Sequence, residues 1–438
     1  MEIKNNYKTW SFILIFLSWS SFFLGFYLDE NSAGAGTYKG DWIFLWSNLQ
    51  IFLNNDVSDA INHENFLTNR SPLLYILHKL FNPFVGNEIS YRKSVFIISL
   101  ATPIIFYLCL KQKFKGQDNL LLFLVASTIL LSPYYRTSSF WGLEENYGFI
   151  SLLLAFLFLN FFLENDGRND FKSYFQLFFS IFFSSVCIYF DQKLLIIPII
   201  CFLTIVNSRK KIKFKIFSIF LYLILSLPYV YLIMLWGGIF PTNLTQSRDL
   251  GNKLYFDHIG YTSTIISFYL FPFLFFKGKN FFILIKNFFF KKNNYFYISL
   301  FFIYIFYLLI SSHFFGQSFL NIDISLGKGF VHKFSLILFN DFLTREIFVY
   351  FSFFVSWIII LIFLNKNLFD SLILIYFFLI SILILPILQE YFDPLILLMI
   401  FTFFNSKLFL NYKNAIILFL YLLIFLISSN VYYYNLLK

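Results

Sequence analysis

Apolar runs of about 20 residues recur along the whole chain, and this feature most limits what the chain can fold into. A helix must be about that long to cross the roughly 30 Å hydrocarbon core of a bilayer, because it rises about 1.5 Å per residue. Only 13% of the 438 residues are charged and 59% are hydrophobic. Soluble domains are roughly 25% charged, so this chain cannot cover a soluble fold with polar surface. The sequence therefore predicts an all-α polytopic membrane protein.

Helix is the expected form of these runs, because lipid offers no partner to an unpaired backbone N–H or C=O group. We expect about 11–13 transmembrane helices that together form one transmembrane domain over residues 1–438. The candidate spans cover residues 9–28, 94–110, 119–133, 148–163, 173–190, 194–206, 216–235, 262–276, 296–315, 347–364, 368–388, 394–405 and 414–434.

Charge predicts how these spans are oriented. If the N-terminus with Lys4 and Lys8 is cytoplasmic, the cytoplasmic side holds 20 of the 33 basic residues but only 6 of the 23 acidic ones. This distribution follows the rule that basic residues accumulate on the cytoplasmic side. The net charge of +10 thus marks one side of a membrane, and we expect no nucleic-acid partner. The preferred location is a bacterial-type plasma (inner) membrane.

The longest predicted outer connection covers residues 29–93. Within it, the apolar residues of 42–53 recur at helical spacing. A second apolar stretch, 71–81, has Pro72 at a helix start and is too short to span a bilayer. Both stretches are typical of helices that lie in the membrane interface. The alternative is a surface loop whose amphipathic pattern is fortuitous.

An acidic pair, Asp29 and Glu30, follows the first span directly, and Asp41 comes after a glycine-containing stretch. A carboxylate held at this depth is partly removed from water. Its pKa is therefore expected to rise toward the range useful for a general base. The alternative is a pair of helix-end charges that marks the interface.

Further polar residues lie at the outer ends of later spans. In a protein poor in charge, such a gathering at one membrane face indicates a functional site. The candidate substrate-binding residues are Asp41, Arg136, Glu144, Glu145, Lys193, Arg248, Gln389 and Tyr391.

A lipid-linked phosphate at the membrane surface needs charge-assisted hydrogen bonds, and the planar guanidinium group supplies them in pairs. Arg136, at the outer end of the third candidate span, is the first candidate for this contact, and Arg248 and Lys193 follow it. The alternative is that Arg136 pairs with Glu144 or Glu145 and braces its own loop.

This arrangement resembles the GT-C superfamily of integral-membrane glycosyltransferases, which includes protein mannosyltransferases and aminoarabinose transferases. The resemblance rests on one span, an acidic pair at its outer end, a long first outer loop with two interface helices, and many further spans. It implies that Asp29 or Glu30 is the catalytic base. It also implies a polyprenyl-phosphate sugar donor, a glycan, lipid or protein acceptor, and transfer at the outer face of the membrane. Participation of a divalent cation is left open.

Two other functional classes stay open on the sequence. A lipid-linked glycan flippase or transporter would place ionisable residues near the middle of its spans, whereas here they cluster at the outer ends. Polysaccharide polymerases and ligases tend to have their large outer loop late in the chain, whereas here it is the first. A purely structural membrane role would leave the acidic pair unexplained.

Overall fold

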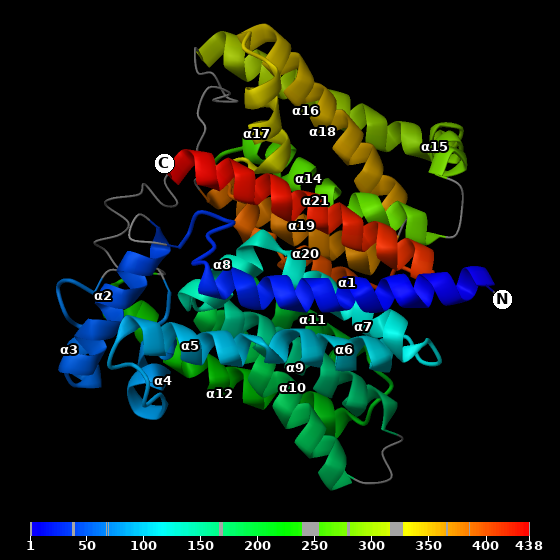
Figure 1. Ribbon diagram of the computed structural model, residues 1–438. Helices are drawn as coiled ribbons and strands as arrows, with labels where there is room; N and C mark the ends of the chain where they lie inside the picture. The colour runs from blue at the N-terminus through cyan, green and yellow to red at the C-terminus, as the bar shows by residue number, and fades with distance from the viewer. Residues whose placement is uncertain are drawn as a thin grey trace. The chain divides into compact units, whose positions relative to one another are not determined.

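The computed structural model describes residues 2–36, 40–66, 68, 70–165, 170–238, 254–277, 281–315, 327–364, 367–384 and 386–437. Over these ranges every regular element is a helix (Figure 1). The chain divides into two compact units. Unit 1 comprises Met1–Ser247, Phe401–Phe403 and Phe419–Lys438, and unit 2 comprises Arg248–Ile400 and Phe404–Leu418. That the whole chain acts as one transmembrane domain stays a prediction.

Unit 1 is built from long helices joined by short connections, together with the C-terminal part of α21. Its other α-helices are α1 (Glu2–Tyr27), α2 (Asp41–Asn54), α3 (Val57–Ile61), α4 (Leu73–Phe81), α5 (Glu88–Ser99), α6 (Ala101–Lys113), α7 (Asn119–Ser127), α8 (Pro133–Trp141), α9 (Glu145–Glu164), α10 (Asp170–Phe190), α11 (Ile196–Asn207) and α12 (Ile212–Trp236). Two short 3₁₀ helices, η1 (Thr128–Leu131) and η2 (Gln192–Leu195), precede α8 and α11.

Unit 2 contains the remaining helices. These are α14 (Asp257–Leu270), η3 (Phe271–Lys277), α15 (Phe281–Phe289), α16 (Lys292–Phe315), α17 (Gly329–Leu338), α18 (Phe342–Leu364), α19 (Leu368–Leu383), η4 (Gln389–Tyr391), α20 (Leu395–Phe401) except its last residue, and the first part of α21 (Tyr412–Leu437). Helices α14 and α18 pack closely, because a Cβ atom at Gly260 would lie only 2.3 Å from the Phe353 ring.

Eight helical segments among the described residues are long and apolar enough to cross a membrane. They are Asn6–Tyr27, Glu88–Lys113, Glu145–Glu164, Asp170–Phe190, Ile212–Trp236, Asp257–Phe276, Phe342–Leu364 and Tyr412–Tyr434. The number rises to ten if two bent pairs count as one span each: Asn119–Leu131 with Pro133–Trp141, bent by 70°, and Phe282–Phe289 with Asn294–Ile310, bent by 85°. The polytopic helical architecture is therefore confirmed, with fewer spans in the described residues than the predicted 11–13.

Three of the predicted spans form helices shorter than the roughly 20 residues that a bilayer needs. Helices α11, α19 and α20 have 12, 16 and 7 residues. The side chains of α20 are at most 1% exposed, from Leu395 to Phe401. Its hydrophobicity thus serves burial inside the protein. Hydropathy cannot separate this kind of burial from burial in lipid, which explains why the apolar run of α20 was predicted as a span.

One end of unit 1 gathers connections that the sequence places in the cytoplasm. Lys8, near the start of α1, lies 3.0 Å from Asp118, which precedes α7. Lys115, after α6, lies 2.7 Å from Glu164, which ends α9. The start of α1, the α6–α7 connection and the end of α9 therefore meet at one end of the unit. This agrees with the predicted alternation of the spans, and the compartment that each end faces stays a prediction.

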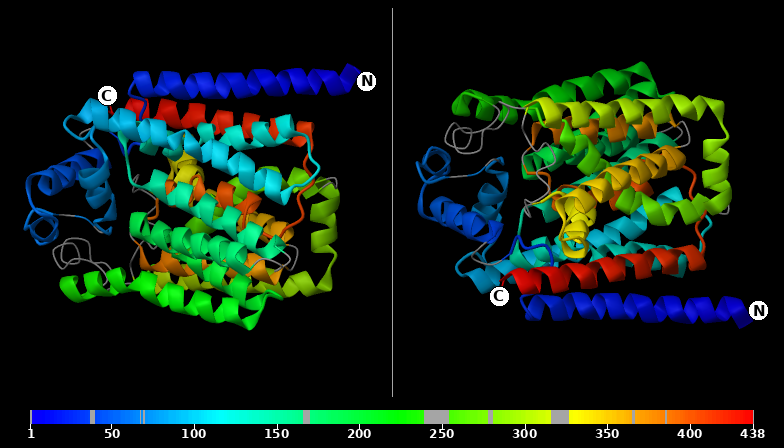
Figure 2. Two further views of the ribbon diagram at one scale, coloured as in Figure 1. Left: turned by 90° about the horizontal axis from the view of Figure 1, so that it is seen from below. Right: turned by 90° about the horizontal axis from the view of Figure 1, so that it is seen from above.

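Helices α2, α3 and α4 lie together beyond the other end of unit 1, where α1 ends (Figures 1 and 2). The apolar stripe predicted for α2 is real, but it packs against protein. Trp42, Leu49 and Phe52 on this stripe have no exposed surface. The Phe52 ring stacks on that of Tyr75 in α4, with ring centroids 5.3 Å apart. The two helices thus form a small layer with its own core, and its position in the membrane interface stays a prediction.

Candidate functional site

The candidate site begins at the C-terminal end of α1. The backbone N–H of Glu30 donates to the carbonyl of Gly25 at 2.9 Å, and that of Asp29 donates to the carbonyl of Phe26 at 3.3 Å. These two bonds form a Schellman motif, in which the residue after the cap is usually glycine. Asp29 occupies that position with a left-handed φ of 51°. A side chain costs about 1 kcal/mol there, and such costs concentrate at functional sites.

The side chain of Asp29 is exposed to solvent and forms an ion pair with Arg92. It is 65% exposed, and its carboxylate accepts a hydrogen bond of 2.6 Å from Nη2 of Arg92. Arg92 is itself fixed, because its Nε donates to the carbonyl of Phe140 at 2.8 Å and its guanidinium lies 4.0 Å from the Trp141 ring centroid. Helix α5 therefore contributes a rigid cationic support for an exposed carboxylate.

Glu30 turns inward and forms a buried ion pair with Arg136 of α8. The Nε of Arg136 donates to Oε1 of Glu30 at 2.8 Å, and its Nη2 donates to Oε2 at 2.5 Å. The side chain of Arg136 is only 2% exposed. Helix α8 is held in place for this contact by its own ends: Ser132 caps its first turn, and Gly142 ends it with a left-handed φ of 71°.

The other donors of Arg136 are also used inside the protein. Nη1 donates to the carbonyl of Leu130 at 3.0 Å and to Oγ of Ser21 at 3.3 Å, and Nη2 donates to the carbonyl of Ser21 at 2.8 Å. With the two bonds to Glu30, all five N–H bonds of the guanidinium have acceptors. This geometry argues against a direct phosphate contact by Arg136.

The predicted bracing alternative for Arg136 named the wrong partners, because Glu144 and Glu145 pair with Arg70 instead. Nη1 of Arg70 lies 2.7 Å from Glu144, and Nη2 lies 2.5 Å from Glu145. The hydroxyl of Tyr134 donates to Glu145 at 2.6 Å. Arg70 thus joins the segment before α4 to the short turn between α8 and α9.

The pKa of Glu144 is raised from 4.5 to about 7, chiefly because burial disfavours the charged carboxylate. The guanidinium of Arg70 opposes this shift, and the neighbouring carboxylate of Glu145 adds to it. The raised pKa places the titration of Glu144 near neutral pH.

The remaining predicted residues lie in different places. Asp41 is the first residue of α2. Lys193 pairs with Asp191 at 2.8 Å and lies 5.3 Å from the centroid of the Tyr134 ring, beside the Glu145 cluster. Arg248 falls outside the described residues.

Gln389 and Tyr391 belong to η4 in unit 2. The side chain of Gln389 accepts the backbone N–H of Phe330 at 2.8 Å and donates to the hydroxyl of Tyr269 at 3.1 Å. Gln389 therefore fastens η4 to α17 and α14. The structure thus brings six of the predicted residues together in two neighbouring groups of unit 1: Asp29, Glu30 and Arg136 in one, and Glu144, Glu145 and Lys193 in the other.

Sequence reasoning missed Arg70 and Arg92, which are the cationic partners of three predicted carboxylates. A signal was present, because both arginines lie in the predicted outer connection of a chain whose basic residues gather mostly on the other side. An arginine on the predicted outer side is an exception to the excess of basic residues on the cytoplasmic side. Pairing with the acidic residues of the outer connections explains this exception.

The described residues include no group of three or more His, Cys, Asp or Glu side chains arranged to hold a metal ion. Comparison with protein-family models, with curated proteins and with solved structures gave no match. The long apolar helices support the class of integral membrane proteins.

Proposed function

We propose that this protein is an integral-membrane glycosyltransferase of the GT-C type. It moves a sugar from a polyprenyl-phosphate-linked donor to an acceptor hydroxyl at the outer face of the membrane. The observation that carries this proposal is the exposed carboxylate of Asp29, held by Arg92 at the end of the first membrane helix. The order of the elements resembles that of the GT-C superfamily, and this resemblance implies a catalytic base at this point of the chain.

In the proposed reaction, Asp29 takes the proton of the acceptor hydroxyl. The acceptor oxygen attacks the anomeric carbon of the sugar, the bond from this carbon to the phosphate oxygen breaks, and polyprenyl phosphate leaves with the electron pair. A positioned general base contributes about 10²–10⁴-fold to such a rate. Asp29 suits this role better than Glu30, because both oxygens of Glu30 are engaged by Arg136.

Arg92 is the best-placed cation for the donor phosphate. It uses its Nε and one Nη2 hydrogen for Phe140 and Asp29, and its remaining three N–H bonds have no acceptor among the described residues. Arg136 is fully occupied, and Lys193 already pairs with Asp191. A phosphate held by Arg92 would place the sugar beside Asp29, where the acceptor hydroxyl is deprotonated.

The ion pairs of unit 1 favour this proposal over a transporter. Those recorded in its described part lie near helix ends or in short helices, as Asp29–Arg92, Arg70–Glu144 and Lys115–Glu164 do. A transporter is expected to place such groups near the middle of its spans. The ion pairs of this unit therefore lie near the ends of its long helices, and a lipid-linked phosphate would lie at the same level.

The test uses the full chain reconstituted in vesicles that contain polyprenyl-phosphate mannose or aminoarabinose, with crude envelope lipids and glycans as acceptors. Release of polyprenyl phosphate is followed by mass spectrometry. Asp29→Asn should lower the rate about 10²-fold or more. The matched control is Asp118→Asn. Asp118 is also an aspartate in an ion pair, 3.0 Å from Lys8, but it lies at the other end of the unit. Equal rates for both variants would refute the role of Asp29.

A further inference from the structure

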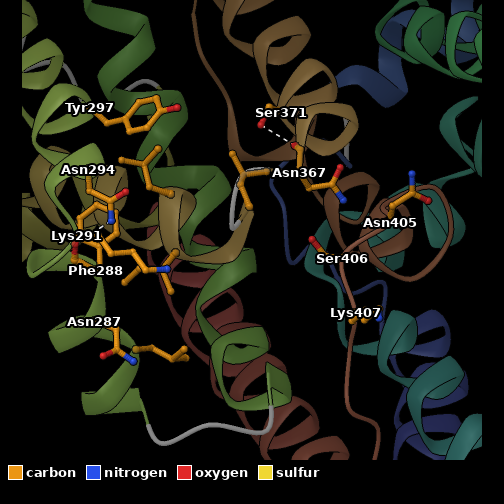
Figure 3. A pocket seen from close by; sticks show the side chains of 14 residues that line it. Asn287, Phe288, Lys291, Asn294, Tyr297, Asn367, Ser371, Asn405, Ser406 and Lys407 are labelled. Carbon is orange, nitrogen blue, oxygen red and sulfur yellow. Dashed lines mark hydrogen bonds between the residues drawn. The ribbon is translucent and has the colours of Figure 1, made fainter.

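Unit 2 contains a cavity of about 480 Å³ that is separate from the site described above. Its walls face each other in Figure 3. One wall comes from α15, α16 and the connection between them, with Asn287, Asn294 and Lys291, respectively. The other wall comes from the start of α19 and from the segment that follows α20, with Asn405 and Lys407. The volume lies within the range of roughly 300–1,000 Å³ that is usual for small-ligand sites.

The lining is cationic and rich in amides. Lys291 and Lys407 are exposed, and neither has an ion-pair partner among the residues that the structure places. Asn287 and Asn405 are exposed beside them. None of the described residues that line the cavity is acidic. Two ammonium groups with amide N–H donors nearby form the combination that binds a phosphate.

A carboxylate behind this wall belongs to Asp370, which is buried and already engaged. It accepts the backbone N–H groups of Asn405 at 2.8 Å and Ser406 at 3.0 Å, and the hydroxyl of Ser406 at 2.6 Å. Its charge therefore fixes the segment that carries Asn405 and Lys407. Two lysines against one buried carboxylate leave the cavity with a net positive charge.

Helix α15, beside the cavity, has the features of a helix that lies at a membrane surface. It is bent by 85° from α16, and the two helices together are apolar enough for one membrane span (Figure 2). Phe282 and Phe290 are each 76% exposed, and Ile283 is 50% exposed. Lys286 lies between them in sequence, 6.0 Å from the Phe290 ring centroid. A short helix across the end of a span, with exposed rings and lysines, is typical of a helix at the membrane surface.

We propose that this cavity binds the phosphate and glycerol hydroxyls of an anionic phospholipid headgroup, such as phosphatidylglycerol, in the cytoplasmic leaflet. The leaflet follows from the predicted orientation, in which the connections with Lys291 and Lys407 are cytoplasmic. Lys291 and Lys407 bind the phosphate, and the amides of Asn287 and Asn405 bind the hydroxyls. The proposal goes beyond the glycosyltransferase reaction and does not depend on it.

The test is a titration of the purified full chain with phosphatidylglycerol or phosphatidylcholine, followed by native mass spectrometry. The wild type should bind phosphatidylglycerol in preference to phosphatidylcholine. The double variant Lys291→Gln/Lys407→Gln should lose roughly tenfold or more in affinity for phosphatidylglycerol, because each lysine contributes to anionic-lipid binding. Asn287→Ala should weaken phosphatidylglycerol binding while leaving the charge unchanged.

The matched control is Lys8→Gln/Lys115→Gln, which removes two lysines from the same predicted side of unit 1. This control should keep the wild-type affinity. An equal loss in both double variants would overturn the proposal, because it would indicate diffuse charge attraction. Displacement of phosphatidylglycerol by millimolar inorganic phosphate would overturn the lipid assignment in favour of a free-phosphate site. Circular dichroism and size-exclusion profiles verify that each variant is folded.

Discussion

Arg136 and Glu30 lie 106 residues apart in the sequence and form a two-bond ion pair, with donor–acceptor distances of 2.8 and 2.5 Å. The pair joins α8 to the end of α1. Trp141, at the end of α8, also donates to the carbonyl of Glu30 at 3.0 Å, and Asn430 of α21 donates to its carboxylate at 3.2 Å. Glu30 is therefore a point where three helices meet, and it fixes the backbone that presents Asp29.

This pairing predicts that Arg136→Met lowers stability strongly. The substitution leaves the largely buried Glu30 carboxylate without its partner, and breaking a buried pair in this way costs about 3–5 kcal/mol. Unfolding of the purified protein in detergent measures the loss. Lys8→Met is the control, because its pair with Asp118 has side chains 50% and 37% exposed, and such surface pairs contribute about 0–1 kcal/mol. A folded Arg136→Met protein of wild-type stability would contradict the bracing role.

A second prediction separates catalysis from folding at Asp29. Asp29→Gly should lower activity about 10²-fold or more while stability stays within about 1 kcal/mol of the wild type. Glycine relieves the left-handed strain at this position, and this gain offsets the loss of a largely exposed ion pair and the greater freedom of glycine in the unfolded chain. Turnover and thermal unfolding are measured on the same preparation. A large loss of stability would show that Asp29 is mainly structural.

A third prediction concerns Arg92 and the donor phosphate. Arg92→Lys keeps the positive charge but removes the planar pair of donors, so the KM for the lipid-linked donor should rise about tenfold or more. The affinity for the acceptor should change little. Steady-state kinetics with each substrate varied in turn distinguish the two. An unchanged donor KM would assign Arg92 only to the positioning of Asp29.

A fourth prediction follows from the raised pKa of Glu144. The folded protein retains a proton on this carboxyl that the unfolded chain releases, since the pKa rises from 4.5 to about 7. The resulting stabilisation is complete below about pH 4.5 and is lost as the pH rises through about 7. Glu144→Gln removes this titration, so the difference in unfolding temperature between the two proteins should change across that window. A constant difference would show that Glu144 does not titrate there.

A fifth prediction tests orientation. Ser58, in α3, and Lys211, before α12, are both exposed and lie in connections predicted to face opposite sides. In intact cells, a membrane-impermeant maleimide should label Ser58→Cys and leave Lys211→Cys unlabelled. The background should be low, because the native cysteines Cys109, Cys187 and Cys201 are buried. The reverse labelling pattern would invert the topology.

The sequence by itself determined the helical membrane class and the ends of several spans. The first span was predicted over residues 9–28, and the structure has Asn6–Tyr27. This success has a local cause: a backbone in lipid must satisfy its hydrogen bonds within each segment, so a long apolar run has only one regular form. The position of the acidic pair directly after that run can also be read from the sequence, because Asp29 and Glu30 follow Leu28 in the chain.

Tertiary structure decided which charges meet. Arg92 is 63 residues from Asp29 and reaches it only because α5 lies beside the end of α1. Arg70 reaches Glu144 and Glu145 across a similar distance in the chain, which no spacing rule predicts. The same limit applies to α20, whose apolar run is buried in protein. Ion pairs and burial depend on the packing of segments distant in sequence, whereas hydropathy records only the chemistry of each segment.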